Sequence, residues 1–70
     1  MKLKQIRKNK GITQEQLSAL SKVSIPEIRC LEQGKINDYD VKLGTYVKLA
    51  KALNVKISDL TDIDLHKKYW

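Results

Sequence analysis

The stretch VSIPEIRCLEQG, residues 23–34, carries the signals of a short helix at both of its ends. Ser24 precedes Glu27 by three residues, the spacing of a capping box, in which each side chain bonds the backbone N–H of the other residue. Pro26 suits the first turn, where its missing N–H costs little. Gly34 follows as a residue that readily adopts the left-handed conformation in which many helices end.

The two sides of this predicted helix, residues 25–33, differ in chemistry. At about 100° per residue, Ile28, Leu31 and Glu32 gather on one side. Because the two apolar side chains need burial, this side should face the interior, with the carboxylate at its edge. A buried carboxylate needs a partner, and Arg7 is the best candidate; the alternative is that both charges extend into water. The opposite side presents Pro26, Arg29, Cys30 and Gln33, with Ile25 at its edge.

A second helix is predicted just before this one, over residues 14–21. Thr13 and Gln16 have the spacing of another capping box, and Leu17 and Leu20 follow at helical spacing. Only two or three residues separate the two helices. So short a turn favours a crossing angle near 90–120° over antiparallel packing.

The rest of the chain predicts three more helices. The first covers about residues 2–10, with Leu3 and Ile6 inside and Gly11 as its stop. The fourth would be capped by Asp40, end at Asn54 and present a core stripe, and a short fifth would be capped by Ser58. The stripe of the fourth helix consists of Leu43, Tyr46, Val47, Ala50 and Leu53. The pattern favours an all-α, compact five-helix domain.

Composition restricts the classes of function. Lysine and arginine total 14 against 8 acidic residues, which gives a formal net charge of +6, and the excess lies in residues 1–56. A compact basic domain favours a polyanionic partner, although surface charge can also serve solubility alone. Cys30 is the only cysteine, so no disulfide can form within the chain. No apolar run approaches the roughly 20 residues of a membrane span, and no signal peptide is expected.

The sequence divides into a domain and a tail. Residues 1–61 form the predicted domain, and residues 62–70 form a short C-terminal extension that ends in Tyr69 and Trp70. This aromatic end has two interpretations, a segment that docks onto the domain or part of a dimer contact.

The run TQEQLSALSKVSIPEIRCLEQGK, residues 13–35, resembles the helix-turn-helix of the phage repressor and Cro family, also called the XRE family. The similarity extends over residues 3–60, through LKQIRKNKGITQEQL and YVKLAKALNVKISDL. It implies a lambda repressor-type fold and a transcriptional regulator that binds double-stranded DNA, with residues 25–33 in the major groove. It also implies a homodimer on a palindromic operator, in the cytoplasm of a bacterium or phage host, at the nucleoid.

The resemblance assigns roles by position. Gln14 matches a glutamine that bonds a DNA phosphate, aided by the N-terminus of its helix, and Thr13 and Ser24 would add backbone contacts. Arg7 and Glu32 match an ion pair between the first and third helices. The base-reading region corresponds to Ile25, Pro26, Arg29 and Cys30. Phosphate contacts at the end of that helix and in the following loop correspond to Gln33, Lys35 and Asn37.

Some positions depart from the family pattern. Lys22, which adds charge beside the reading face, stands where glycine is usual and should be held in the left-handed conformation at some cost. Arg29 could bind a guanine through O6 and N7, and Ile25 could contact a thymine methyl. Because Ile25, Pro26 and Cys30 are apolar or weakly polar, DNA shape would supply much of the remaining specificity. Asp38 and Asp40, in a loop longer than usual, should point away from the phosphates.

Other functions fit the sequence less well. There is no Ser/His/Asp arrangement, no cysteine–histidine metal spacing and no glycine-rich phosphate loop, so we expect no enzyme, metal or cofactor. No small-molecule ligand or membrane contact is expected either. The alternative is an antitoxin-like module that neutralises a protein partner. DNA binding should weaken steeply with salt, whereas an apolar contact through the tail should not.

Overall fold

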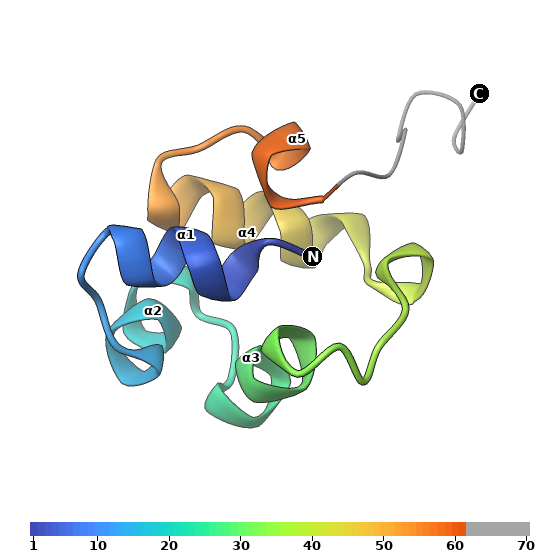
Figure 1. Ribbon diagram of the computed structural model, residues 1–70, viewed down its shortest axis with the longest axis horizontal. Coiled ribbons are helices and arrows are strands. Elements are labelled where there is room, and N and C mark those ends of the chain that lie inside the picture. The colour runs from blue at the N-terminus through green and yellow to red at the C-terminus, as the bar shows by residue number, and fades with distance from the viewer. Residues whose placement is uncertain (62–70) are drawn as a thin grey trace.

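The computed structural model of the protein describes residues 1–61, which contain five α-helices, one short 3-10 turn and no strand (Figure 1). The helices are α1 (Leu3–Asn9), α2 (Gln14–Ser21), α3 (Ile25–Glu32), α4 (Leu43–Leu53) and α5 (Ile57–Leu60), and the turn η1 (Asp38–Asp40) lies between α3 and α4. The predicted all-α, five-helix class is confirmed. The roles predicted for residues 62–70 lie outside the described residues.

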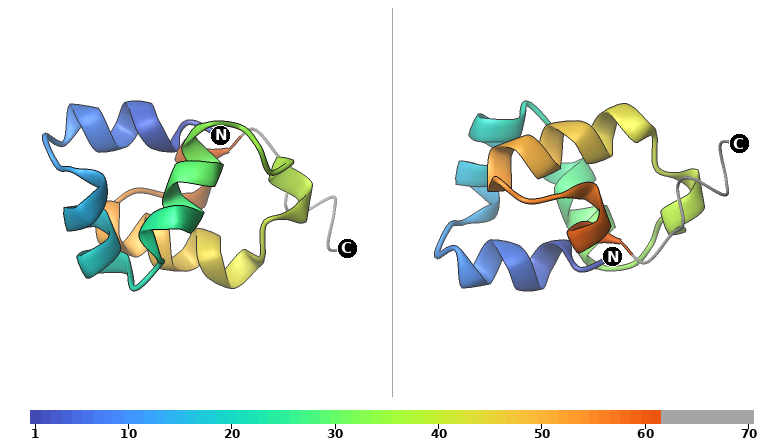
Figure 2. Two further views of the ribbon diagram at one scale, coloured as in Figure 1. Left: turned by 90° about the horizontal axis from the view of Figure 1, so that it is seen from below. Right: turned by 90° about the horizontal axis from the view of Figure 1, so that it is seen from above.

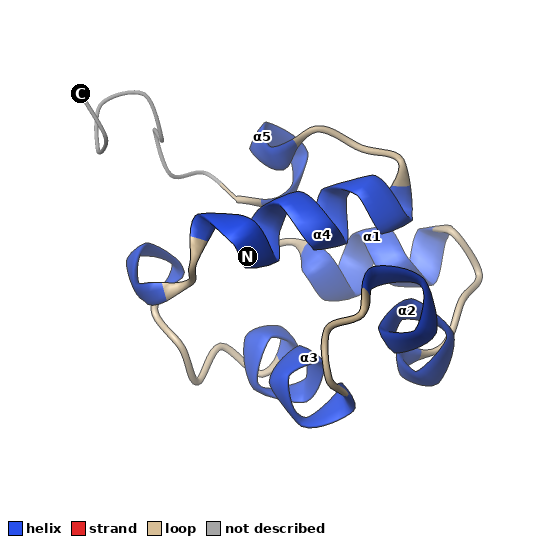
Figure 3. Cartoon of the chain, turned by 180° about the vertical axis from the view of Figure 1, so that it is seen from behind, coloured by secondary structure: helices blue, strands red, loops and turns tan. Residues whose placement is uncertain are grey.

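Helix α3 lies across one side of the domain. Seen from below in Figure 2, it crosses the view between α1 and α4, with α2 beside it. Seen from behind in Figure 3, α2 and α3 sit together below α1 and α4. One side of α3 therefore faces the other helices, and the opposite side faces outward.

The core takes apolar side chains from all five helices. The largest fully buried side chains are those of Leu3, Leu17, Ile28, Tyr46, Leu49, Leu53 and Leu60. The predicted stripe of α4 is buried at Tyr46, Ala50 and Leu53, whereas Val47 is only half-buried. Leu43 is 44% exposed because it opens the helix at the border of the core. Leu20, near the end of α2, is also exposed. Among the described residues, no helix is both long and apolar enough to cross a membrane.

Two predicted helix starts are wrong. Helix α4 begins at Leu43 after Lys42, because Asp40 lies in η1, which Asn37 caps by accepting a hydrogen bond from Tyr39 N–H at 2.9 Å. Helix α5 begins after Lys56 and not after Ser58. There the carboxylate of Asp59 accepts from Lys56 N–H at 3.1 Å, so a residue inside the helix closes its first turn.

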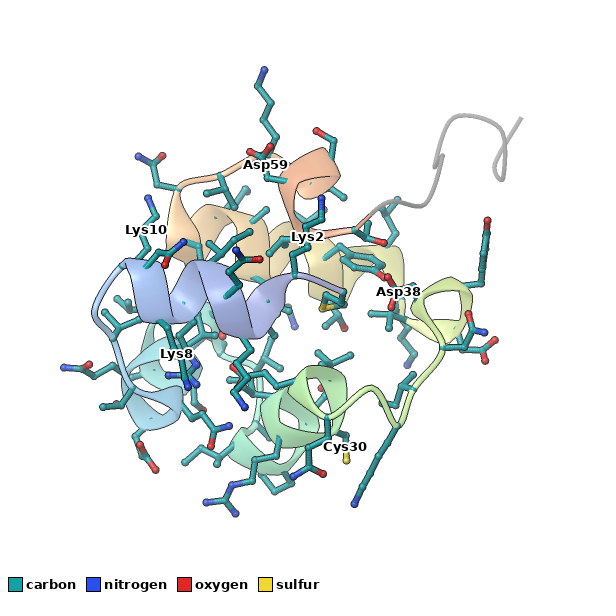
Figure 4. The ribbon with its side chains drawn as sticks, in the orientation of Figure 1. Lys2, Lys8, Lys10, Cys30, Asp38 and Asp59 are labelled. Atoms are coloured by element: carbon teal, nitrogen blue, oxygen red, sulfur yellow. The ribbon has the colours of Figure 1, made fainter. Side chains whose placement is uncertain are left out.

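The segment between α3 and α4 is tied to distant parts of the chain through Asp38. Its carboxylate accepts hydrogen bonds from the Met1 amino group at 3.3 Å and from Thr61 Oγ1 at 2.7 Å. Its carbonyl oxygen accepts from the Tyr46 hydroxyl at 2.8 Å. Asp38 therefore points inward and away from the outer side of α3, as predicted (Figure 4).

Candidate nucleic-acid interface

The turn between α2 and α3 is fixed by its own residues. Lys22 has φ 64° and ψ 19°, the left-handed conformation that the family resemblance implies. Ser21 Oγ accepts from Val23 N–H at 3.2 Å, and Ser24 Oγ accepts from Glu27 N–H at 3.3 Å. The reciprocal bond that the capping-box prediction assigns to the Glu27 side chain is not formed. The serine cap is enough to start α3 at a defined point.

The N-terminus of α2 carries a complete capping box. Thr13 Oγ1 accepts from Gln16 N–H at 3.0 Å, and Gln16 Oε1 accepts from Thr13 N–H at 2.8 Å, as predicted. The first N–H groups of a helix have no intrahelical partner, and together with the helix dipole they favour a negative charge. This end of α2 therefore suits an anion such as a phosphate.

An ion pair joins α1 to α3 behind the outer face. Arg7 donates from Nε to one oxygen of Glu32 at 2.6 Å and from Nη2 to the other at 3.0 Å. The side chains are 9% and 2% exposed, so the pair is shielded from water. Arg7 Nη1 also donates to the carbonyl oxygen of Ile12 at 2.8 Å, which fixes the guanidinium on a third side. The predicted pair is confirmed, and it anchors the inner side of α3.

The pKa of Glu32 shows that the carboxylate is stabilised in its charged form. Burial alone would raise this pKa, but hydrogen bonds from Arg7 and Gln14, with the positive charges of Arg7 and Lys4, lower it below its usual value. The hydrogen bond to Glu32 in turn raises the pKa of Arg7, against the opposing effect of burial. Both groups therefore stay charged at neutral pH.

Gln14 links this ion pair to the outer face. Its Nε2 donates to Glu32 Oε1 at 3.1 Å, and its Oε1 accepts from Arg29 Nε at 3.4 Å. The sequence predicts Gln14 as a phosphate contact but gives no signal for either of these bonds. They depend on the packing of α2 against α3, which no local pattern specifies.

The outer side of α3 is accessible and carries the positive charge of Arg29. Pro26, Arg29 and Gln33 are exposed, whereas Ile25 and Cys30 are half-buried. The sulfur of Cys30 points outward from the helix in Figure 4. We define the outer face of α3 as the surface formed by the four residues expected to read bases, Ile25, Pro26, Arg29 and Cys30, together with Gln33, which is expected to contact a phosphate.

A family model described as helix-turn-helix (HTH_3) matches residues 3–60, which is most of the chain. The chain belongs to the helix-turn-helix family of XRE and Cro/C1 type. No curated protein and no solved structure matches it at a significant level. Membership of this family identifies the protein as a DNA-binding helix-turn-helix regulator.

The other residues predicted to contact DNA lie around the outer face of α3. Those that surround the outer face of α3 are exposed: Thr13, Lys22, Ser24, Lys35 and Asn37. Asn37 Oδ1 is used as the cap of η1, so its amide group is the end available to donate.

One basic residue near the helix-turn-helix has no assigned role in the sequence analysis. Lys4 of α1 is exposed and close enough to Glu32 for its charge to help lower that pKa. Its position one turn before the inward-pointing Arg7 is the signal that could have placed it beside α3.

Proposed function

We propose that this regulator inserts the outer face of α3 into the major groove of double-stranded DNA and reads a specific sequence there. The observation that carries the proposal is the contrast between the two sides of one helix. Arg7 holds Glu32 on the inner side at 2.6 Å, while Arg29 on the outer side is exposed. An α-helix fits the major groove, where the base edges are distinguishable.

Two side chains make the main proposed base contacts. Arg29 binds a guanine through O6 and N7, and Ile25 packs against a thymine methyl group. Pro26 and Cys30 offer little hydrogen bonding, so sequence-dependent DNA shape supplies the rest of the specificity. This distribution predicts one strongly specified base pair in each half-site, next to positions with weaker preferences.

The proposed phosphate contacts surround these base contacts. The N-terminus of α2, with Gln14 and Thr13, receives one phosphate, and Ser24 adds a backbone contact at the start of α3. Cationic and amide side chains at the two ends of α3 contact further phosphates. These are Lys22, Gln33, Lys35 and Asn37.

A homodimer on a palindromic operator is the proposed assembly, with residues 62–70 as a dimer contact or as a segment docked on the domain. Two helix-turn-helix units of a dimer contact half-sites about 34–36 Å apart, or a multiple of this. Deleting residues 62–70 tests the dimer contact. If the tail forms it, sedimentation should show a shift from dimer to monomer, and an unchanged dimer would remove that role.

Selection of bound fragments from random DNA tests the proposal directly. We expect a conserved, two-fold symmetric site whose affinity falls steeply as salt rises, because phosphate contacts release counterions. A protein that captures no duplex would overturn the proposal. Binding of a protein partner with little dependence on salt would instead support the antitoxin-like alternative.

Arg29→Ala isolates the main base contact. It should weaken binding to the selected site by about 1–3 kcal/mol and relax the preference at one base pair. Lys51→Ala is a matched control because it also removes one exposed positive charge, from α4. Equal losses on all sequences would mean that Arg29 contacts only phosphate.

A further inference from the structure

The side-chain amide of Gln14 is bonded at both of its ends. Its Nε2 donates to Glu32 Oε1 at 3.1 Å, and its Oε1 accepts from Arg29 Nε at 3.4 Å. Only the oxygen of an amide can accept from a guanidinium, and only its NH₂ group can donate to a carboxylate. Both partners therefore require the same orientation of the Gln14 amide, with its oxygen toward Arg29 and its NH₂ group toward Glu32.

One end of this arrangement is rigid. The side chain of Glu32 is 2% exposed and receives two hydrogen bonds from Arg7, which is itself held by the carbonyl oxygen of Ile12. The other end, Arg29, is exposed on the outer face of α3. A continuous series of hydrogen bonds thus runs from the buried ion pair, through Gln14, to the side chain expected to read a base.

The contact leaves a specific part of Arg29 available. Gln14 occupies Nε, so the two Nη groups remain to bind another partner. Guanine presents two acceptors, O6 and N7, to an arginine in the major groove. A long side chain already held near its bound conformation loses less freedom on binding.

We propose that Gln14 is a positioning residue that holds Arg29 with its two Nη groups directed toward a guanine. The inference rests on the proposed function and adds a determinant of specificity outside the recognition helix. The phosphate contact proposed for Gln14 is compatible, because its backbone N–H and second amide proton take no part in the two side-chain bonds. A pure phosphate contact would affect all sequences equally, whereas a positioning role acts on one base pair.

The first test needs no DNA. The chain has two arginines, Arg7 and Arg29, so the two Nε–H signals in an NMR spectrum can be assigned with Arg29→Ala. In Gln14→Ala, the Arg29 Nε–H signal should shift and exchange faster with water. Gln5→Ala removes an exposed glutamine of α1 and should leave that signal unchanged. An Arg29 signal that is identical in wild type and Gln14→Ala would overturn the inference.

The second test measures base preference. We compare the affinities of wild type, Gln14→Ala, Arg29→Ala and the double variant for the selected site and for the same site with the guanine replaced. Gln14→Ala should reduce the preference for guanine about 3- to 10-fold, the range of one modest hydrogen bond, since the 3.4 Å contact is long. In the Arg29→Ala background the same change should leave the preference unaltered.

The outcomes separate the two proposals. A uniform loss of affinity in Gln14→Ala, with the preference for guanine intact, would limit Gln14 to the phosphate and overturn the positioning role. A wild-type protein that binds no duplex would overturn the proposed function, and the NMR comparison would still decide whether Gln14 holds Arg29.

Discussion

Glu32, in α3, and Asp38, in η1, are two carboxylates that each join three parts of the molecule. Their surroundings differ. Glu32 lies inside a helix with its side chain 2% exposed and connects α1, α2 and α3. Asp38 lies in a short turn with its side chain 27% exposed and connects the Met1 amino group to Thr61. Water screens the second site more than the first.

The comparison teaches that the two carboxylates organise different functions. Glu32 fixes the helices that carry the candidate DNA-binding surface, and it contacts Gln14, which contacts Arg29. Asp38 fixes the long loop to the ends of the described chain. Removing Glu32 should therefore affect both stability and the preference for a base pair, whereas removing Asp38 should affect stability and leave that preference unchanged.

The largest effect is expected from Glu32→Ala. It leaves the buried guanidinium of Arg7 without its anionic partner, a change that costs about 3–5 kcal/mol in proteins. Unfolding in urea should show this loss, and Glu15→Ala, an exposed carboxylate of α2, should cost at most about 1 kcal/mol. If Glu32→Ala is as stable as Glu15→Ala, the ion pair does not hold the domain together.

A smaller effect is expected from Asp38→Asn. The amide keeps the shape of the side chain but loses the charge that binds the Met1 amino group, so the unfolding free energy should fall by about 1–2 kcal/mol. Asp40→Asn, in the same turn but exposed, should change it by less than about 0.5 kcal/mol. Equal effects of the two substitutions would show that η1 is held by its backbone alone.

Lowering the pH should reduce the stability that the Glu32 carboxylate contributes to the fold. Its pKa is lower in the folded state than the usual value of about 4.3, so the unfolded chain takes up the proton first. The stabilisation is complete above that value and is lost as the pH falls through the folded pKa. The ¹³C carboxyl shift of Glu32 should keep its ionised value below about pH 4.3.

The stability of Glu32→Gln provides the control for this pH dependence. Because the amide does not titrate, its unfolding free energy should fall less steeply in acid than that of the wild type. Parallel curves for the two proteins would contradict the lowered pKa.

The smallest effect concerns the two non-glycine residues with a left-handed backbone in the described part of the chain. Lys22 has φ 64° in the turn between α2 and α3, and Asn54 has φ 57° at the end of α4. Asparagine tolerates this conformation better than lysine, so Lys22→Gly should stabilise by about 0.5–1 kcal/mol and Asn54→Gly by less. Thermal unfolding measures both, and a destabilised Lys22→Gly would mean that the lysine side chain contributes more than its backbone strain costs.

Much of the helix-turn-helix could be predicted because its signals are local or periodic. Residues 14–21 were predicted as a helix and match α2, and the capping box of Thr13 and Gln16 forms as expected. The pairing of Arg7 with Glu32 followed from the inner sides of two helices and from the family resemblance. Periodicity identifies which side chains face inward. It can therefore indicate an ion pair when the inner side of each of two helices carries one charged residue.

Other features could not be predicted because a competing local turn or a partner far away in the sequence decides them. Asp40 is of a residue type that often caps helices, and the sequence predicts it as the cap of α4. It lies instead in the turn η1, and α4 starts at Leu43 without a side-chain cap. The bonds of Gln14 to Glu32 and Arg29 depend on how closely α2 approaches α3. No short-range pattern contains that distance.

The sequence by itself determined the presence of five helices and the side of α3 that faces inward, because capping and periodicity act within a few residues. The left-handed conformation of Lys22 followed from the family resemblance. The tertiary structure alone decided that Asp38 meets Met1 and Thr61, and that Gln14 reaches both Glu32 and Arg29. Such contacts form only when packing of the apolar core brings distant segments within hydrogen-bonding distance.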